Sequence, residues 1–288
     1  MPPAACHTMT PPAPRLPYFD ALLNLLTQNQ ASIEQAFGKH VHWGYWPDPA
    51  KASLSPEDFA QAAEALTQWV TGAASIADGQ SVLDAGCGFG GAVMSLDERF
   101  HNMNLAGLNI DARQLARARK HLPAQPGNRL SWIQSDACAL PFADHSFDAV
   151  LAVECIFHFP SRKRFLAEAF RVLRPGGRLA ISDFIPITGL GPLLRLAAGW
   201  PVSRGFYGRC KLHCTLRAYR RLATDAGFML DRVQDITPQT LPTYDFIRAL
   251  SRQIGIPGPS ALLETLFAEY ASRLGLLRYY VLGFSKPE

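Results

Sequence analysis

The sequence has no long hydrophobic run, and we expect no secretory leader. None of its segments reaches the roughly 18 consecutive apolar residues of a membrane-spanning helix, and residues 1–6 lack the basic start and apolar core of a signal peptide. The six cysteines show no disulfide-framework spacing: Cys6, Cys87, Cys138, Cys155, Cys210 and Cys214. We therefore expect a cytoplasmic protein with reduced thiols and no stable membrane insertion.

Nucleic-acid and metal sites also have little support. The net charge is only +4, and basic residues such as Arg113, Arg117 and Lys120 are spread along helical stretches, which is typical of a solvated helix face. The segment from Cys210 to Cys214 holds too few ligands, at poor spacing, for zinc. We expect no nucleic-acid partner and no metal site.

The stretch from Ser81 to Gly91 carries the strongest positive signal. Val82 and Leu83 form a short apolar strand that ends at Asp84, and a glycine-rich turn leads into a helix near Gly91. Glycines let the backbone approach a ligand closely, and a helix N-terminus presents free N–H groups to it. The stretch predicts a cradle for a nucleotide-like ligand.

The glycines also satisfy the dinucleotide spacing G-x-G-x-x-G, at Gly86, Gly88 and Gly91. That fingerprint requires an acidic residue at the end of the second strand, where this chain has Asn109. A nicotinamide-dependent oxidoreductase is therefore an alternative that Asn109 opposes.

Downstream of the turn, strand and helix patterns alternate, which indicates a parallel sheet with helices on both faces. Ser55, Asp111 and Ser161 are predicted helix caps. The length and the 48% hydrophobic content suit one domain with a smaller cap. We expect strands after the first over 105–110, 129–134, 147–153, 178–184, 228–236 and 277–284.

This pattern divides the chain into five parts. A proline-rich lead over 1–17 is expected to be disordered, and a helical lid follows over 18–75. The α/β core that binds the cofactor spans 76–184, lid insertions with the sixth strand span 185–275, and the last strand lies in 276–288.

The residues Val82-Leu-Asp-Ala-Gly-Cys-Gly88 resemble the first motif of class I S-adenosylmethionine-dependent methyltransferases, and Leu140 to Asp148 resembles a later segment of that family. The small-molecule, tocopherol-like and sterol-like subgroup is the most similar. The resemblance implies an α/β fold with a Rossmann-like seven-stranded sheet, its last strand antiparallel beside the sixth, and lid segments that select the substrate.

The resemblance also implies a cofactor site for S-adenosyl-L-methionine. Asp84 matches the acid that interacts with the methionine amino group, and Asn109 stands where most members have an acid for the ribose hydroxyls. Asp136 matches the acid that contacts adenine. Gln114 helps to hold the cofactor in a similar subgroup, with an exposed helix side chain as the alternative. The predicted site is completed by Gly86, Cys87, Gly88, Ile110, Ala137 and Glu154.

Three further residues are assigned to the lid and to catalysis. Tyr45 matches a tyrosine that closes over the cofactor in similar enzymes, and its alternative is core packing. His158 follows the fourth strand and is the candidate general base, because imidazole titrates near working pH. Asp183, at the end of the fifth strand, is predicted to orient His158. A structural histidine and a helix-capping aspartate remain alternatives.

The sequence thus predicts methyl transfer to a small, largely apolar metabolite in secondary-metabolite biosynthesis, by a monomer or homodimer. Methylation of oxygen is favoured over methylation of carbon or nitrogen, with His158 as the candidate base for a hydroxyl acceptor. A non-catalytic cofactor-binding protein is the remaining alternative.

Overall fold

The computed structural model describes residues 16–28, 30–121, 124–189, 205–208, 210–254 and 259–288. Its centre is a seven-stranded sheet in the order β3-β2-β1-β4-β5-β7-β6. β7 pairs antiparallel with both β5 and β6, while the pairs among β1 to β5 are parallel. The strand bounds are β1 Ser81–Ala85, β2 Asn104–Asn109, β3 Arg129–Gln134, β4 Phe147–Val153, β5 Leu173–Pro186, β6 Met229–Asp235 and β7 Leu277–Ser285.

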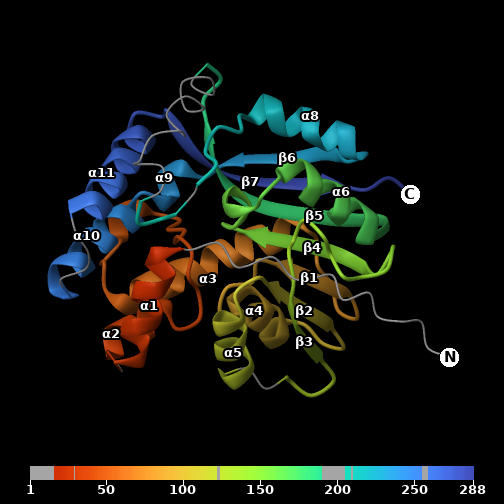
Figure 1. Ribbon diagram of the computed structural model, residues 1–288, viewed down its shortest axis with the longest axis horizontal. Coiled ribbons are helices and arrows are strands. Elements are labelled where there is room, and N and C mark those ends of the chain that lie inside the picture. Colours follow the sequence, from red (N-terminus) through yellow and green to blue (C-terminus); the bar gives the residue numbers. More distant parts are fainter. Residues whose placement is uncertain (1–15, 29, 122–123, 190–204, 209, 255–258) are drawn as a thin grey trace.

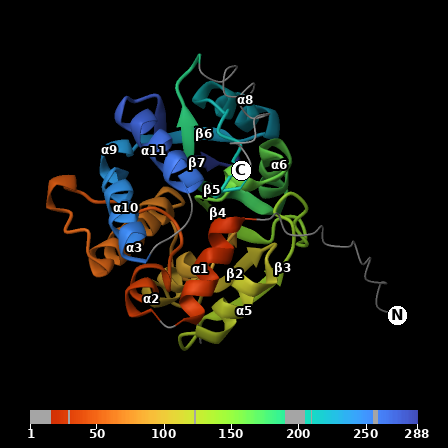
Figure 2. The ribbon, with the colours of Figure 1, turned by 60° about the vertical axis from the view of Figure 1, so that its left-hand side comes forward.

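Helices cover both faces of the sheet and one of its ends. Figure 1 shows α1, α2 and α10 grouped at the end toward which β4 and β6 point, and Figure 2 shows α1 lying over the ends of the strands. The helices are α1 Pro17–Thr27, α2 Ala31–Phe37, α3 Pro56–Ala73, α4 Gly91–Arg99, α5 Ala112–His121, α6 Arg162–Val172, α8 Leu216–Ala226, α9 Thr237–Thr240, α10 Pro242–Ile254 and α11 Pro259–Arg273, with short turns η1 Pro49–Lys51 and η2 Ile156–His158.

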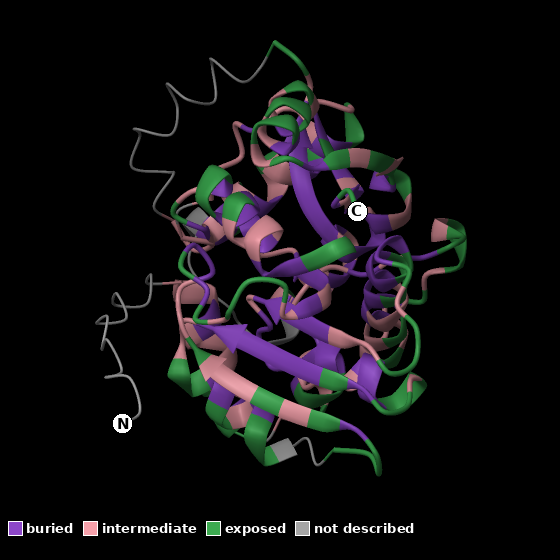
Figure 3. Cartoon of the chain, turned by 90° about the vertical axis from the view of Figure 1, so that its right-hand side faces the viewer, coloured by how far each residue is buried: buried purple, intermediate pink, exposed green. Residues whose placement is uncertain are grey.

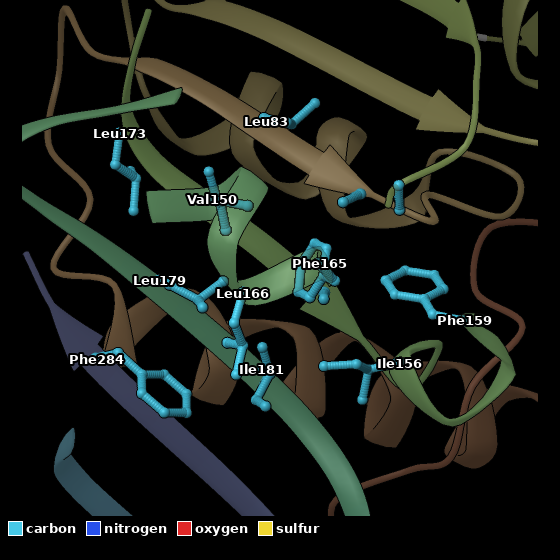
Figure 4. Packing of buried hydrophobic residues seen from close by; sticks show 14 of the residues in the cluster. Leu83, Val150, Ile156, Phe159, Phe165, Leu166, Leu173, Leu179, Ile181 and Phe284 are labelled. Carbon is cyan, nitrogen blue, oxygen red and sulfur yellow. The ribbon is translucent and has the colours of Figure 1, made fainter. Parts of the chain in front are cut away.

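Side chains alternate between two cores because successive strand residues point to opposite faces. On one face, Phe165 and Leu166 of α6 pack against Leu83, Val150 and Ile181 (Figure 4). On the other face, α3 and α4 pack against the intervening strand residues, a cluster that includes Leu66, Val70, Val82, Val93, Leu151 and Val281. The central strands are largely buried, whereas edge strand β3 is more exposed (Figure 3).

Local signals set most helix starts. Ser55 accepts a hydrogen bond from the N–H of Asp58, and Ser161 accepts one from that of Arg164. The Asp111 carboxylate accepts the N–H of Arg113. The three predicted caps are therefore confirmed, because a short oxygen-bearing side chain satisfies a free N–H of the first turn.

The predicted end of the lead and the predicted start of the fifth strand differ from the structure. Residues 1–15 of the predicted lead lie outside the described part, but α1 already begins at Pro17, whose ring pre-sets helical φ. β5 begins at Leu173, which pairs with Phe147 ahead of a register shift, so it starts before the predicted residue 178. Positions 190–204 and 209 of the predicted lid insertion also lie outside the described residues.

Within the described part of the chain, every helix falls short of the combined length and apolarity that crossing a membrane demands.

Candidate active site

A cavity of about 240 Å³ opens at the carboxyl ends of the parallel strands. Parallel strands end at one edge of a sheet, so polar residues far apart in the sequence converge there. Residues 16, 18 and 19 and residues 39–42 contribute the opposite wall. The lining includes eleven of the thirteen predicted site residues: Asp84, Gly86, Cys87, Gly88, Asn109, Ile110, Gln114, Asp136, Ala137, Glu154 and His158.

The glycine turn after β1 forms the floor of this cavity. Gly86 has φ +87° and Gly88 has φ +54°, conformations that residues with a Cβ rarely adopt. A Cβ at Gly86 would lie 2.7 Å from Sγ of Cys155, and one at Gly88 would lie 2.8 Å from Val41. The turn therefore needs glycine at both positions, and it brings backbone and the N-terminus of α4 to the ligand space.

Asp84 is a buried carboxylate that faces the cavity. It is 3% exposed, and its Oδ1 has no hydrogen-bond partner among the described residues. Burial raises the pKa of Asp84 to about 7. A buried, unpartnered carboxylate is costly unless a cationic ligand group pairs with it, so the site fits the methionine amino group of S-adenosylmethionine.

Asn109 and Gln114 form a joined pair in the wall. Asn109 donates from Nδ2 to Oε1 of Gln114 at 3.0 Å, and its Oδ1 accepts the N–H of Asp111 at 3.1 Å. Gln114 is 3% exposed, which excludes the alternative of an exposed helix glutamine. After the neighbouring strand β3, Asp136 Oδ1 accepts the N–H of Cys138.

Glu154 connects the cavity to the far side of the sheet. Its φ is +50°, its N–H donates to Oγ of Ser182, and its Oε2 accepts from the N–H of Trp43 and the hydroxyl of Tyr279. Burial raises the pKa of Glu154 to about 8, although these two donors oppose the shift. The side chain is thus anchored through one oxygen.

Two histidines line the cavity beside the start of α4. Nε2 of His40 lies 2.8 Å from Oε2 of Glu64, and Nε2 of His42 lies 3.0 Å from Oγ1 of Thr67. A Cβ at Gly91 would lie 2.4 Å from Nδ1 of His40. Burial lowers the pKa of His40, and it lowers the pKa of His42 to about 3, so His42 is a neutral imidazole.

His158 lies in η2, beside a residue that the sequence analysis missed. Nε2 of His158 is 3.3 Å from the hydroxyl of Tyr18, and the two rings are stacked with centroids 6.0 Å apart. Tyr18 belongs to α1, 140 residues earlier, and only its helical spacing in the N-terminal segment hinted at a roof position.

The predicted pairing of His158 with Asp183 is wrong. Asp183 is fully buried, does not line the cavity, and accepts hydrogen bonds from Arg162 at 2.8 Å and from Tyr219. Arg162 also donates to the carbonyl of Lys211. A guanidinium satisfies a buried carboxylate better than a neutral imidazole does, and the resulting cluster ties β5 to the segment before α8.

We expect Asp183→Ala to lower the free energy of unfolding by about 3–5 kcal/mol, because it leaves Arg162 as an unpaired buried charge. Asp231→Ala, which breaks the more exposed pair with Arg178, should change it by only about 0–1 kcal/mol. Urea unfolding of both variants measures the difference. A normal midpoint with lost turnover in Asp183→Ala would restore the catalytic assignment.

Tyr45 was predicted to close over the cofactor, but its side chain does not line the cavity, so this prediction is also wrong. Its ring stacks on Trp69 with centroids 5.0 Å apart, and its N–H donates to the carbonyl of Ala62, so it packs on α3 outside the cavity lining. The preceding residues 40–42 line the cavity instead.

The sheet order with an antiparallel β7 and the cavity at the ends of β1, β2 and β4 define a class I methyltransferase fold. A family model described as a methyltransferase domain matches residues 83–181. The geranyl diphosphate C-methyltransferase of Streptomyces coelicolor A3(2) superposes with a TM-score of 0.69 at 21% identity, over 96% of this chain and 100% of that one.

Two relatives are similar over most of their length. Methyltransferase GfsG of Streptomyces halstedii is 36% identical over 82% of this chain and 80% of its own. The 27-O-demethylrifamycin SV methyltransferase of Amycolatopsis mediterranei (strain S699) is 30% identical over 91% of this chain and 89% of its own. The chain belongs to the S-adenosylmethionine-dependent small-molecule methyltransferases. The oxidoreductase alternative is thereby excluded.

Proposed function

We propose that the protein methylates a hydroxyl oxygen of a small, largely apolar metabolite in secondary-metabolite biosynthesis, with His158 as the general base. One observation carries the proposal: His158 lines the cavity, and its Nε2 lies 3.3 Å from the hydroxyl of Tyr18, near the distance at which a base takes a proton from a hydroxyl. A relative named as a 27-O-demethylrifamycin SV methyltransferase supports an oxygen acceptor.

Different residues of the cavity bind different parts of S-adenosylmethionine. Asp84 pairs with the amino group of the methionine moiety, and the amides of Asn109 and Gln114 bind the ribose hydroxyls. Asp136 accepts from the adenine amine. The glycine turn brings backbone close to the ligand, with Gly86 and its neighbours as the floor.

When bound, S-adenosylmethionine supplies a methyl group that its sulfonium already activates. The chain then has to align the acceptor, exclude water and hold the released proton. His158 takes that proton on Nε2, and the aromatic residues around Tyr18 exclude water from the acceptor. Glu154, anchored by Trp43 and Tyr279, holds the end of β4 beneath this space.

The experiment is incubation with S-adenosylmethionine carrying ¹³C in its methyl group, together with polycyclic phenols, alcohols and matched amines. We expect labelled methyl ethers, which ¹³C NMR separates from N-methyl and C-methyl products by chemical shift. Labelled N-methyl or C-methyl products alone would contradict the choice of oxygen. A relative named as sterol 24-C-methyltransferase, 30% identical over 65% of this chain, makes carbon the second candidate.

A further inference from the structure

Tyr18 places a phenol in contact with the base proposed above. Its hydroxyl is 3.3 Å from Nε2 of His158, its ring stacks on the imidazole at an interplanar angle of 23°, and the residue lines the cavity. Burial raises the pKa of Tyr18 well above its usual value, so the side chain is a neutral phenol. The arrangement is that of an aryl hydroxyl with its oxygen against an imidazole nitrogen.

The surroundings of this ring are aromatic. Tyr18 contacts Phe206 in an edge-on geometry at 6.4 Å and Tyr207 at 5.8 Å, and its N–H donates to the carbonyl of Phe206. Such edge-on and tilted contacts favour a flat aromatic ring over a branched aliphatic group. Two lid segments that are distant in the sequence therefore meet around one phenol ring beside His158.

The reactive hydroxyl of the acceptor must lie where the Tyr18 hydroxyl lies in the structure. For His158 to remove the acceptor's proton, the acceptor oxygen must approach Nε2, where the Tyr18 hydroxyl lies. Tyr18 and His158 both line the cavity that Asp84 and the glycine turn also line. The acceptor and Tyr18 therefore compete for one position.

We infer that Tyr18 occupies the site of the acceptor's reactive hydroxyl, and that the acceptor is a phenol whose ring replaces that of Tyr18. This inference rests on the proposed function and names its substrate class. In the reaction the phenol O–H proton passes to Nε2 of His158, the oxygen bonds to the methyl carbon, and the bond from sulfur to methyl breaks, which leaves S-adenosylhomocysteine.

The attachment of α1 is compatible with displacement of Tyr18. No side chain caps the start of this helix, and Asp20 pairs with the exposed Arg113, an interaction that contributes little to stability. Phe19 and Leu26 are the buried residues of α1. The hydrogen bond to His158, at 3.3 Å, is longer than most O–H···N bonds.

The test removes the Tyr18 ring by mutation and adds 4-methylphenol, which has the same ring and hydroxyl, as a free molecule. Tyr18→Ala should open a space shaped for 4-methylphenol, since cavities left by aromatic deletion bind matching aromatic molecules. By calorimetry without cofactor, we expect 4-methylphenol to bind this variant at least ~10-fold more tightly than the parent, and more tightly than toluene. Tyr45→Ala is the matched control, because its ring packs on Trp69 outside the cavity, and it should show no such gain.

With S-adenosylmethionine present, Tyr18→Ala should convert 4-methylphenol to 4-methoxytoluene. Tyr18→Ala/His158→Ala should do so at least ~10²-fold more slowly. Equal binding of 4-methylphenol by parent and Tyr18→Ala would overturn the inference, as would binding without methylation in a protein that binds S-adenosylmethionine. If Tyr18→Ala does not fold by circular dichroism, Tyr18→Val takes its place with the same expectations.

The two proposals fail in different ways. The proposed function would be contradicted if the parent protein did not bind S-adenosylmethionine. It would also be contradicted if all products were methylated on nitrogen or carbon. Failure of the 4-methylphenol experiment, in a protein that methylates other hydroxyls, would remove only the assignment of Tyr18 and of a phenolic acceptor.

Discussion

His158→Ala is expected to lower kcat by about 10²- to 10⁴-fold, which is the usual contribution of a positioned general base. The affinity for S-adenosylmethionine should change little, because the proposed contact of His158 is with the acceptor. The measurement is the rate of S-adenosylhomocysteine formation with the best acceptor from the labelled series, at saturating cofactor. Added imidazole should restore part of the lost rate, since it can take the proton that the variant cannot.

The control for this experiment is His101→Ala. His101 is an exposed imidazole beside Asp78, at the opposite end of the sheet from the cavity, and its removal should leave kcat unchanged. A decrease of only a few-fold in His158→Ala would mean that alignment alone drives transfer. That result would also remove the preference for oxygen, because an amine acceptor needs no base of this kind.

Asp84→Asn is expected to weaken S-adenosylmethionine binding by about 2–5 kcal/mol, or ~30- to 4,000-fold in Kd, the cost of removing one partner of a buried charge pair. The amide keeps the shape of the carboxylate, so the loss reports the missing charge. Asp148→Asn is the matched control. Asp148 lies at the start of β4, paired with Arg174, and its replacement should not alter Kd.

The raised pKa of Asp84 adds a dependence on pH. Its pKa in the folded protein is about 7, against about 3.9 in an unfolded chain. The ionised form binds the cofactor amino group, so affinity should increase as the pH rises toward about 7, and Asp84→Asn should lack this increase. Calorimetry at several pH values below that at which the amino group deprotonates measures both proteins.

Stability without cofactor should change in the opposite sense. A carboxyl whose pKa is raised by burial destabilises the fold once it ionises, so the penalty is absent below about pH 4 and complete above about pH 7. Asp84→Asn should therefore unfold at higher urea than the parent at pH 8 and at the same urea at pH 4. A parent that is more stable than the variant at pH 8 would show that Asp84 has a partner.

Local patterns predicted the sheet with little error. β3 and β4 have the predicted bounds, β2 and β6 differ by one residue at each end, and β7 differs by one residue at its last position. Apolar runs between turn residues mark strands directly. The resemblance to class I methyltransferases implied a last strand antiparallel beside the sixth, and the structure confirms it, with β7 between β5 and β6. β5 is the exception, since its early start depends on pairing with Phe147.

The strand-end residues of the cavity were predictable for a related reason. Asp84, Asn109 and Asp136 each follow a strand, and parallel strands bring their carboxyl ends to one edge. Position along the chain was therefore enough to group them. The acceptor side was not, because α1 and residues 205–208 reach it only through packing, as the contact between Tyr18 and Phe206 shows.

By itself, then, the sequence determined the family, the sheet, the glycine turn and most of the strand-end residues that line the cavity, because motifs and strand order fix all of these. Only the tertiary structure decided which polar side chains from distant parts of the chain contact one another. Asp183 meets Arg162 and Tyr219 rather than His158, and His158 meets Tyr18 instead. The physical reason is that a buried charge takes the partner that best satisfies it, and packing of distant segments decides which partners are within reach.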